Sequence, residues 1–261
     1  MRRALHVLCM ILSVVLTDMG VARAASSAVE TGIPILVYHR FGPVVADSMT
    51  VTTPVFEQQL AWLREHDYRL LPLRAAIDAI SGSGPQDVGR AVVITVDDGH
   101  RSVYTELFPL IQRYRFPVTL FIYPSAISNA SYAMRWEQIA EMIQSGLVDV
   151  QSHTYWHPNF HREKARLKPD EYKAFAMSQL LRSKKTLMER LHGDVSVLSW
   201  PFGIVDAELE QMAHAAGYVA GFTLERRPAT RPADLLALPR YLITDRDRGA
   251  RFAAIATGTA R

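Results

Sequence analysis

Short apolar runs alternate with amphipathic stretches along most of the chain. Seven of these runs are strand candidates, and several of them are apolar at successive positions, which is the pattern of strands that are buried on both faces. They are residues 33–38, 91–96, 118–123, 148–152, 195–200, 218–224 and 236–243. Strands separated by helical segments indicate a parallel sheet with helical crossovers, and seven such units in one domain favour an α/β barrel over a doubly wound sheet.

The segments between these runs have the periodicity of helices. Candidate helices cover residues 54–63, 102–115, 136–144, 170–191 and 206–216. We expect Thr53 to cap the first of them, with Pro54 in its first turn, and Gly217 to end the last. Pro109 lies inside the second and should kink it, because proline removes a backbone hydrogen bond.

The first 24 residues are typical of a secretory signal peptide. Arg2 and Arg3 precede a short apolar run, and Ala22-Arg23-Ala24 is a small-residue cleavage site. The run is shorter than the roughly 20 residues that a membrane-spanning helix needs, so we expect no membrane span after processing. We predict an exported monomer, periplasmic or secreted, with a signal peptide over 1–24, a leader over 25–32 and one domain over 33–261.

Removal of that segment changes the charge balance and the cysteine count. The whole chain has 29 basic and 26 acidic residues, and without three arginines and one aspartate of the segment it has 26 and 25. Charge therefore gives no reason to expect nucleic-acid binding. The single cysteine, Cys9, lies in the same segment, so the mature chain must hold any metal with histidine and carboxylate side chains.

Two adjacent carboxylates, Asp97 and Asp98, follow the strand predicted at 91–96. They stand in the sequence Thr95-Val96-Asp97-Asp98-Gly99, where ionised side chains are costly unless they are paired or hold a metal. Neighbouring residues of an extended chain point to opposite sides, so one carboxylate can bind a metal while the other faces the substrate. The alternative is an Asp-Asp-Gly turn without chemistry.

Two histidines, His153 and His157, follow the strand predicted at 148–152. Pro158 comes directly after them and makes a long helix there unfavourable, so we expect a loop. Imidazole is a common ligand of zinc. Because the carboxyl ends of the strands of a barrel meet at one face, the aspartates and histidines together predict a site for a divalent ion and a general base. Alone, the histidines could be solvated loop residues.

Together, the two segments resemble the polysaccharide deacetylases of carbohydrate esterase family four. Residues 95–99 are similar to the first motif of that family and residues 152–159 to the second, and the resemblance extends over about residues 33–243. It implies a distorted (β/α)7 barrel in a single domain and hydrolysis of acetamido groups on amino sugars. It also implies that Asp98, His153 and His157 bind the metal and that Asp97 is the catalytic base.

The segment Trp200-Pro201-Phe202-Gly203 is similar to the third motif of the family. There the residue after the proline offers its backbone N–H to the oxyanion, which makes Pro201, Phe202 and Trp200 predicted substrate residues. The family usually carries an arginine two residues before the proline, which braces the catalytic aspartate, and this chain has Ser199 instead. Arg240 could replace that arginine, although surface placement is the interpretation that the sequence favours.

The histidine that the family places near its C-terminus has no counterpart here, because no histidine follows His214. Residues 33–42 are instead similar to the opening of the permuted biofilm poly-N-acetylglucosamine deacetylases, in which the catalytic histidine comes first. This resemblance implies that His39 is the catalytic acid. The alternative is a structural histidine bonded to a backbone carbonyl.

Several aromatic residues near these motifs could stack on sugar rings. They are Tyr38, Tyr123, Tyr155, Trp156 and Phe202, whereas Trp136 has helical spacing to Ile139 and Ile143 and is expected in the core. Core packing is the alternative for each of them.

We therefore predict a metal-dependent N-deacetylase that acts on an N-acetylated polysaccharide and releases acetate. Zinc is the expected ion, and cobalt, nickel and iron also suit histidine and carboxylate ligands. Two alternatives stay open, namely an amidohydrolase of a small non-sugar amide and a catalytically silent carbohydrate-binding protein on the same scaffold. The sequence does not separate peptidoglycan, chitin-like oligomers and poly-β-1,6-N-acetylglucosamine as substrates, although the N-terminal similarity favours the last.

Overall fold

The structure is a computed structural model that describes residues 32–85, 87–231 and 233–260. The predicted signal peptide and all of the predicted leader except Gly32 lie outside the described residues. Among the described residues, no helix is both long and apolar enough to cross a membrane.

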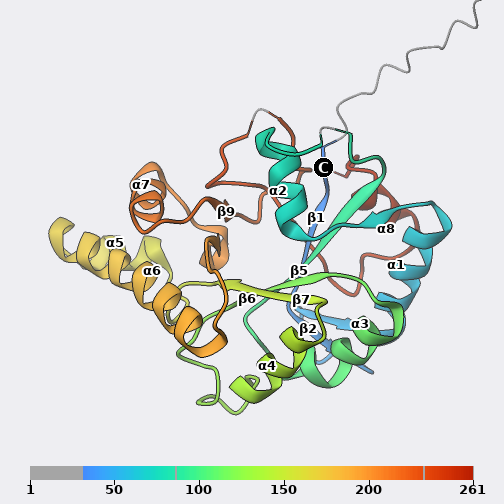
Figure 1. Cartoon of the computed structure of the whole chain (residues 1–261), viewed down its shortest axis with the longest axis horizontal. Coiled ribbons are helices and arrows are strands. Elements are labelled where there is room, and N and C mark those ends of the chain that lie inside the picture. The colour runs from blue at the N-terminus through green and yellow to red at the C-terminus, as the bar shows by residue number, and fades with distance from the viewer. Residues whose placement is uncertain (1–31, 86, 232, 261) are drawn as a thin grey trace, which may run out of the picture.

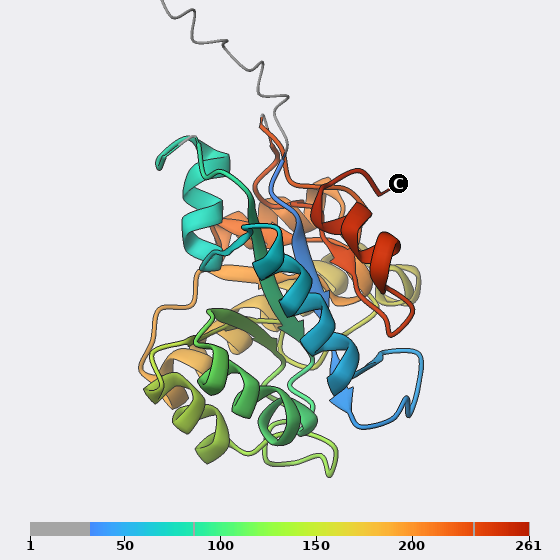
Figure 2. The same ribbon diagram turned by 90° about the vertical axis from the view of Figure 1, so that its right-hand side faces the viewer.

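One parallel sheet forms the centre of the molecule (Figures 1 and 2). Its strand order is β10-β1-β5-β6-β7-β8-β9, and β4 pairs with β5 beside this path. The strands are β1 (Ile35–Tyr38), β4 (Arg69–Leu70), β5 (Ala91–Asp97), β6 (Val118–Ile122), β7 (Val148–Ser152), β8 (Val197–Ser199), β9 (Ala220–Phe222) and β10 (Tyr241–Leu242). A small separate pair consists of β2 (Arg40–Gly42) and β3 (Thr50–Thr52). All seven predicted strands are present: five are shorter than predicted, β7 has the predicted bounds, and β5 extends one residue further, to Asp97.

Helices surround the sheet (Figure 1). They are α1 (Thr53–Glu65), α2 (Leu73–Ser81), α3 (Phe108–Tyr114), α4 (Trp136–Gln144), α5 (Phe160–Arg166), α6 (Pro169–Leu191), α7 (Ala207–Ala215) and α8 (Gly249–Ala256). Two short turns, the π-helical η1 (Val103–Leu107) and the 3-10 turn η2 (Pro201–Gly203), complete the set. The predicted α/β fold is thus confirmed as a curled parallel sheet with helices outside, a distorted (β/α)7 barrel.

The last predicted strand, residues 236–243, joins the two edges of the curled sheet. At one end, Leu238 forms a parallel bridge with Phe222 of β9. At the other end, Tyr241 and Leu242 form β10 and pair with β1. Pro239 and Arg240 lie between these two contacts, so the barrel closes through a seam rather than through one continuous strand, which places Arg240 at the seam.

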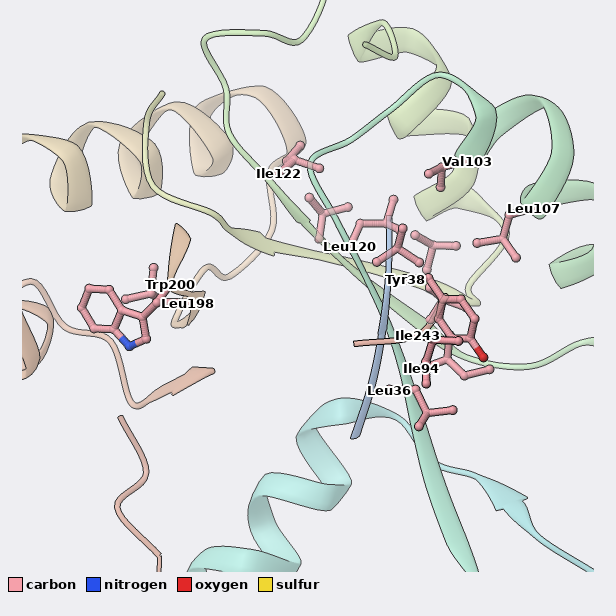
Figure 3. Packing of buried hydrophobic residues seen from close by; sticks show 14 of the residues in the cluster. Leu36, Tyr38, Ile94, Val103, Leu107, Leu120, Ile122, Leu198, Trp200 and Ile243 are labelled. Atoms are coloured by element: carbon pink, nitrogen blue, oxygen red, sulfur yellow. The ribbon is translucent and has the colours of Figure 1, made fainter. Parts of the chain in front are cut away.

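The period-two alternation of the strands separates two apolar clusters. Val92, Ile94 and Val96 of β5 pack outward against the helices, together with Leu36 and Tyr38 of β1 (Figure 3). Val93 of the same strand belongs to a second cluster with Ile35, Phe121 and Phe222, inside the curled sheet. Thr95 and Asp97 follow Val93 at intervals of two, so their side chains also point inward. The alternation of β5 therefore directs Asp97 into the barrel.

Several boundaries differ from the predictions. Thr53 is the first residue of α1 and Thr52 is its N-cap, so the predicted cap is wrong by one residue. The predicted helix over 102–115 is divided into η1 and α3, and Pro109 lies in the first turn of α3, where the missing N–H costs nothing. β2, β3, β4, α2, α5 and α8 were not predicted. Short strands and short helices carry too few periods to be recognised from apolar spacing.

Candidate functional site

Asp97 and Asp98 lie at the carboxyl end of the central strand β5. Asp97 is the last residue of the strand and is buried, whereas Asp98 is partly exposed and turns into the left-handed region with φ 74°. Gly99 follows with φ 74° as well, and a Cβ at this position would lie 3.0 Å from side-chain atoms of Ile122 and Ile127. Two left-handed residues in succession bend the chain sharply away from the strand, which separates the two carboxylates.

His153 and His157 come from the loop after β7, as predicted. The backbone N–H of His153 donates to the carbonyl of Ile122 at 2.9 Å, which continues the β6–β7 ladder by one residue. Its ring Nδ1 lies 2.7 Å from the carbonyl oxygen of Ser199. That carbonyl can only accept, so Nδ1 carries the hydrogen and the lone pair of Nε2 is left facing Asp97 and Asp98.

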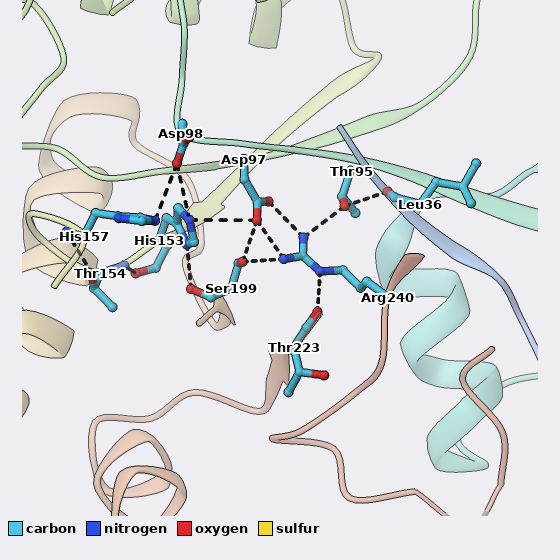
Figure 4. A network of polar contacts seen from close by, with 11 residues as sticks. Leu36, Thr95, Asp97, Asp98, His153, Thr154, His157, Ser199, Thr223 and Arg240 are labelled. Carbon is cyan, nitrogen blue, oxygen red and sulfur yellow. Dashed lines mark hydrogen bonds and ion pairs between the residues drawn. The ribbon is translucent and has the colours of Figure 1, made fainter. Parts of the chain in front are cut away.

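The two imidazoles and the Asp98 carboxylate surround a common point (Figure 4). Asp98 Oδ1 lies 3.6 Å from His153 Nε2 and 3.6 Å from His157 Nε2. The three ligand atoms all lie within 4.8 Å of one another. Asp98 Oδ1 is buried and has no hydrogen-bond partner among the described residues. A buried carboxylate oxygen without a partner is costly, and an ion bound by these three atoms would remove that cost.

The protonation of His157 also fits a metal ligand. Burial lowers the pKa of His157 to about 4, and the neighbouring His153 adds to this effect. The ring is therefore neutral at physiological pH, as a metal-binding imidazole must be. One carboxylate and two imidazoles form a donor set that suits zinc, and with three protein ligands further coordination positions would stay open.

Asp97 is held by an arginine from the seam of the barrel. Arg240 Nη1 donates to Asp97 Oδ1 at 2.9 Å and Nη2 donates to Oδ2 at 2.7 Å, a bidentate pair. Ser199 Oγ donates to Asp97 Oδ2 at 2.9 Å and accepts from Arg240 Nη2 at 2.7 Å. The sequence favoured a surface position for Arg240, and this prediction is wrong, because the exposed fraction of the residue is 0%.

Arg240 is itself fixed by its surroundings. Its Nε donates to the carbonyl of Thr223 at 3.2 Å, and the guanidinium carbon lies 5.4 Å from the ring centre of Phe121 and 5.8 Å from that of Phe222. Burial by itself raises the pKa of Asp97, but the Arg240 guanidinium and then His153 reverse this and hold that pKa well below its usual range. Asp97 is thus an ionised carboxylate in a rigid setting.

A signal for Arg240 was present in the sequence. It is the one charged residue of the apolar stretch 235–243, and charged side chains are almost never fully buried without a partner. Its side chain could therefore have been assigned to a buried carboxylate. The identity of that carboxylate needs the fold, since Arg240 and Asp97 are separated by 143 positions in the chain.

His39 lies between β1 and β2 at the same edge of the sheet. Its Nδ1 is buried and has no hydrogen-bond partner among the described residues. Burial lowers the pKa of His39, while the charges of Asp97 and Asp98 oppose this shift. Tyr38 of β1 pairs with Val96 of β5, so His39 and Asp97 come next on two neighbouring strands at this edge. The alternative of a structural histidine bonded to a carbonyl does not fit an unpartnered Nδ1.

The third predicted motif supplies one residue at the rim of the site. Phe202 has φ 59° and an exposed fraction of 55%, and its ring centre lies 4.6 Å from that of His157. The hydrogen bonds of the turn come from the N–H groups of Gly203 and Ile204, and Pro201 is buried in the first position of η2. The exposed Phe202 therefore stands directly beside the predicted metal ligands.

Two predicted substrate residues do not reach the site. Tyr38 is buried in the outer core and donates from its hydroxyl to Gln59 at 2.9 Å. Trp200 is buried as well, and its Nε1 donates to the carbonyl of Leu236 at 2.8 Å. Both side chains point away from the inward face of their strands because they alternate with inward residues. The prediction that they contact substrate is corrected by this packing (Figure 3).

Other aromatic side chains do line the site. The ring centre of Tyr123 lies 5.3 Å from that of His157, and its hydroxyl lies 2.8 Å from the hydroxyl of Tyr132. Trp156 is exposed and packs edge-on against Phe175. Trp136 is half-buried against the core, as predicted, and lies under the guanidinium of Arg190. Of these aromatic residues, Tyr123 is therefore the one that contacts a predicted metal ligand.

Comparison with known proteins identifies the family. The sequence model described as polysaccharide deacetylase matches residues 85–221, more than half of the chain. The chain belongs to the polysaccharide deacetylase family. The matched segment contains Asp97, Asp98, both metal-site histidines and Phe202, but neither His39 nor Arg240.

Similarity to individual relatives covers more of this chain than residues 85–221. YxkH of Bacillus subtilis, named as a candidate polysaccharide deacetylase, is 29% identical over 223 residues, which cover 85% of this chain and 75% of that protein. The poly-β-1,6-N-acetyl-D-glucosamine N-deacetylase of Staphylococcus epidermidis is 28% identical over 204 residues, 75% of this chain and 68% of the relative. The solved structure of IcaB from Ammonifex degensii superposes with a TM-score of 0.76 at 28% identity and covers 87% of this chain and 97% of that one. The predicted family and fold are thus confirmed.

Proposed function

We propose that this protein removes N-acetyl groups from the amino sugars of a polysaccharide and releases acetate, using a divalent ion bound by Asp98, His153 and His157. The observation that carries the proposal is the buried Asp98 Oδ1, which has no hydrogen-bond partner in the described part of the chain and lies 3.6 Å from the Nε2 atoms of both histidines. Zinc is the preferred candidate, and cobalt, nickel and iron share its ligand chemistry. When bound, such an ion polarises an amide carbonyl and lowers the pKa of water toward about 7.

Asp97 takes the role of general base. It accepts a proton from the water molecule that attacks the amide carbon, and Arg240 and Ser199 hold its carboxylate in place for this transfer. Because the pKa of Asp97 is lowered, the carboxylate is ionised and can accept a proton throughout the physiological pH range. The arginine that the family places before the proline is absent, and Arg240 from the seam supplies the same support.

Two further groups act on the developing charges. The backbone N–H of Phe202 is the candidate donor to the oxyanion that forms at the carbonyl oxygen, and loss of such a donor costs about 10²–10³ in rate. His39 is the candidate acid, which gives its proton to the departing amine as the carbon–nitrogen bond breaks. Burial lowers the pKa of His39, so its imidazolium form is a stronger acid than free histidine.

Exposed aromatic rings favour a polymer over a small amide. Phe202 is exposed beside His157, and the exposed Trp156 precedes His157 in the chain, so both rings offer faces for sugars. The relatives named as poly-β-1,6-N-acetyl-D-glucosamine N-deacetylases support an amino-sugar polymer as substrate. We propose that the protein meets this polymer in the periplasm or outside the cell, as a monomer. A carbohydrate-binding protein without catalytic activity would need neither three candidate metal ligands nor a buried carboxylate held by an arginine and a serine.

Acetate release tests the proposal. The metal-loaded protein is incubated with oligomers of N-acetylglucosamine in β-1,4 and β-1,6 linkage and with glycan chains of peptidoglycan, with and without a chelator, and acetate is measured. We expect release from at least one oligomer and its loss with the chelator. Release that is unaffected by complete metal removal would contradict the metal role.

Asp97→Asn isolates the base. We expect a loss of turnover of about 10²–10⁴, while the bound metal per chain stays the same. Asp170→Asn, an exposed carboxylate in the first turn of α6, is the matched control and should keep full activity. Equal activity of Asp97→Asn and the unchanged protein would remove Asp97 from the base role.

A further inference from the structure

A second, polar pocket lies beside the metal site on the same edge of the sheet. It has a volume of about 430 Å³ and is formed by the start of η1, the loop 128–131 and the beginning of α4. Its lining includes two arginines, Arg101 and Arg135, together with Thr105, Asn129 and Gln138, and it contains no acidic residue and no large apolar one. Such a lining is suited to an anionic, hydrogen-bonding ligand.

Neither arginine is neutralised by a carboxylate. Both guanidinium groups belong to exposed residues, and within the described parts of the chain neither takes part in an ion pair. Arg101 Nη1 makes one long hydrogen bond of 3.4 Å, to the carbonyl of Ser131. Glu141, an acidic residue of α4, accepts instead from the hydroxyl of Tyr104 at 2.6 Å. The positive charge of the pocket is therefore available to a ligand.

The backbone holds the pocket in a fixed position relative to the metal site. Arg101 N donates to the carbonyl of Tyr132 at 2.7 Å, and Met134 N donates to the carbonyl of Gly99 at 3.0 Å. His100 and Ala133 form an antiparallel bridge between these two bonds. Arg101 follows Asp98 by three residues, so their Cα atoms can be at most about 11 Å apart. A ligand in the pocket is thus within a short oligosaccharide of the reacting acetamido group.

The wall of the pocket is also fixed by its side chains. Ser128 has φ 63°, and its Oγ accepts from the backbone N–H of Trp136 at 3.1 Å. Asn129 Nδ2 donates to the carbonyl of Ser125 at 3.0 Å. Because these bonds order the loop without using either guanidinium, the pocket is formed before any ligand arrives, which reduces the cost of binding.

A strip of rings connects the metal site to this pocket. The Tyr123 ring contacts His157, the hydroxyls of Tyr123 and Tyr132 lie 2.8 Å apart, and the Tyr132 ring is nearly parallel to His100 with 6.3 Å between ring centres. Tyr132 has an exposed fraction of 41% and immediately precedes the pocket's Ala133. Tyrosine combines an apolar face with a polar tip, so this strip suits a sugar chain that runs from the metal toward the arginines.

We propose that the Arg101–Arg135 pocket binds an acidic substituent of the substrate, so that the polysaccharide carries carboxylate or phosphate groups besides its N-acetyl groups. This inference rests on the proposed deacetylation, whose substrate class it narrows. The acidic group lies on a sugar next to the one that is deacetylated. The two arginines are positioning residues that act on substrate affinity and register, not on the chemical step.

Three acetylated oligosaccharides of equal length test the pocket at low ionic strength. One is a neutral N-acetylglucosamine oligomer, one alternates N-acetylglucosamine with N-acetylmuramic acid and carries carboxylates, and one carries a 6-phosphate on a neighbouring sugar. We expect kcat/KM to be at least about 10-fold higher for an anionic oligomer than for the neutral one, as for charge-assisted hydrogen bonds to arginine. A preference for only one of the two anionic oligomers identifies the source of the acidic group.

The double variant Arg101→Gln/Arg135→Gln should abolish this ratio, through a rise in KM with kcat nearly unchanged. Arg162→Gln on α5, an exposed arginine outside the lining of the pocket, is the matched control and should keep the ratio. Added salt should reduce the preference of the unchanged protein, because it screens exposed charges. The proposed role of the pocket would be contradicted if the unchanged protein had nearly the same kcat/KM for anionic and neutral oligomers. It would also be contradicted if the double variant kept the preference for an anionic oligomer.

Calorimetric titration with the same oligomers separates the two proposals. Tight binding of an anionic oligomer that releases no acetate would contradict the deacetylation and leave the pocket standing. Acetate release from all three oligomers, with the same affinity in the unchanged protein and in the double variant, would leave the deacetylation standing and contradict the pocket.

Discussion

Two consecutive carboxylates at the end of β5 lie in opposite surroundings. Both oxygens of Asp97 are hydrogen-bonded, to Arg240 and Ser199, and the pair is buried. Asp98 Oδ1 is buried, has no hydrogen-bond partner among the residues that the structure describes, and faces two imidazole nitrogens at 3.6 Å. Asp97, on the braced side, has its partners within the protein, whereas Asp98, on the open side, has an acceptor that a bound ion would satisfy. The difference shows which of two identical side chains is arranged for a ligand.

The Asp97 side and the Asp98 side should therefore differ in what they contribute to the stability of the fold and to metal affinity. Breaking a buried charge pair leaves an uncompensated charge, so the braced side contributes to folding. Removing an unpartnered acceptor relieves a cost, so the open side contributes to ligand binding and little to folding. Variants of each side should therefore separate stability from metal affinity.

The largest expected effect is on the open side. Asp98→Asn keeps the shape of the side chain and tolerates the left-handed backbone of this position. We expect metal affinity to fall by at least about 100-fold, since loss of an outer partner of a metal ligand already costs 10–100-fold, and acetate release should fall with it. Titration with zinc, followed by calorimetry, measures the change.

The same variant should leave the metal-free fold almost unaltered. We expect its unfolding free energy in urea, measured with a chelator present, to stay within about 0.5 kcal/mol of the unchanged protein. A large loss of stability without metal would mean that Asp98 has a structural role, and the contrast between the two carboxylates would disappear.

The next effect is on the braced side. Arg240→Met leaves the Asp97 carboxylate buried and unpaired, and we expect the unfolding free energy to fall by about 3–5 kcal/mol. Asp97→Leu/Arg240→Met removes both charges and should recover most of that loss. Urea unfolding of the two variants measures the difference. A single variant as stable as the unchanged protein would show that the pair does not brace the fold.

The smallest effect concerns pH. The folded-state pKa of Asp97 is lowered, so its interactions stabilise the protein above the unfolded pKa of about 3.9 and are lost as pH falls toward the folded value. We expect the metal-free protein to lose stability below about pH 4, and the Asp97→Leu/Arg240→Met variant to lose less. Urea unfolding between pH 7 and pH 3 measures both curves, and parallel curves would contradict this assignment.

Part of the site could be read from local sequence. The apolar run before Asp97 predicts a buried strand, and the run before His153 predicts another, so both groups fall at strand ends. In parallel strands those ends share one edge, which is enough to bring the aspartates and histidines together. Because neighbouring residues of a strand point to opposite sides, the sequence also predicts that the side chains of Asp97 and Asp98 point in different directions.

Other features depended on contacts between distant segments. Arg240 was considered as a brace for Asp97, but surface placement was favoured, because its bond to Asp97 spans 143 positions and requires the barrel to close at the seam. The burial of Tyr38 and Trp200 was missed because proximity to a motif does not determine which face of a strand a side chain occupies. Short elements such as β2 and α5 were missed because they have too few residues to show a period.

The sequence by itself determined the order of the seven main strands and the five helices between them, the residues that could hold an ion and the family of the protein, because apolar periodicity and strand-end motifs are local properties. Only the tertiary structure decided that Arg240 and Ser199 support Asp97, that Asp98 Oδ1 has no hydrogen-bond partner within residues 32–85, 87–231 and 233–260, and that Arg101 and Arg135 line a pocket beside it. Those features depend on which side chains the curled sheet brings into contact, and this is set by the packing of the whole chain.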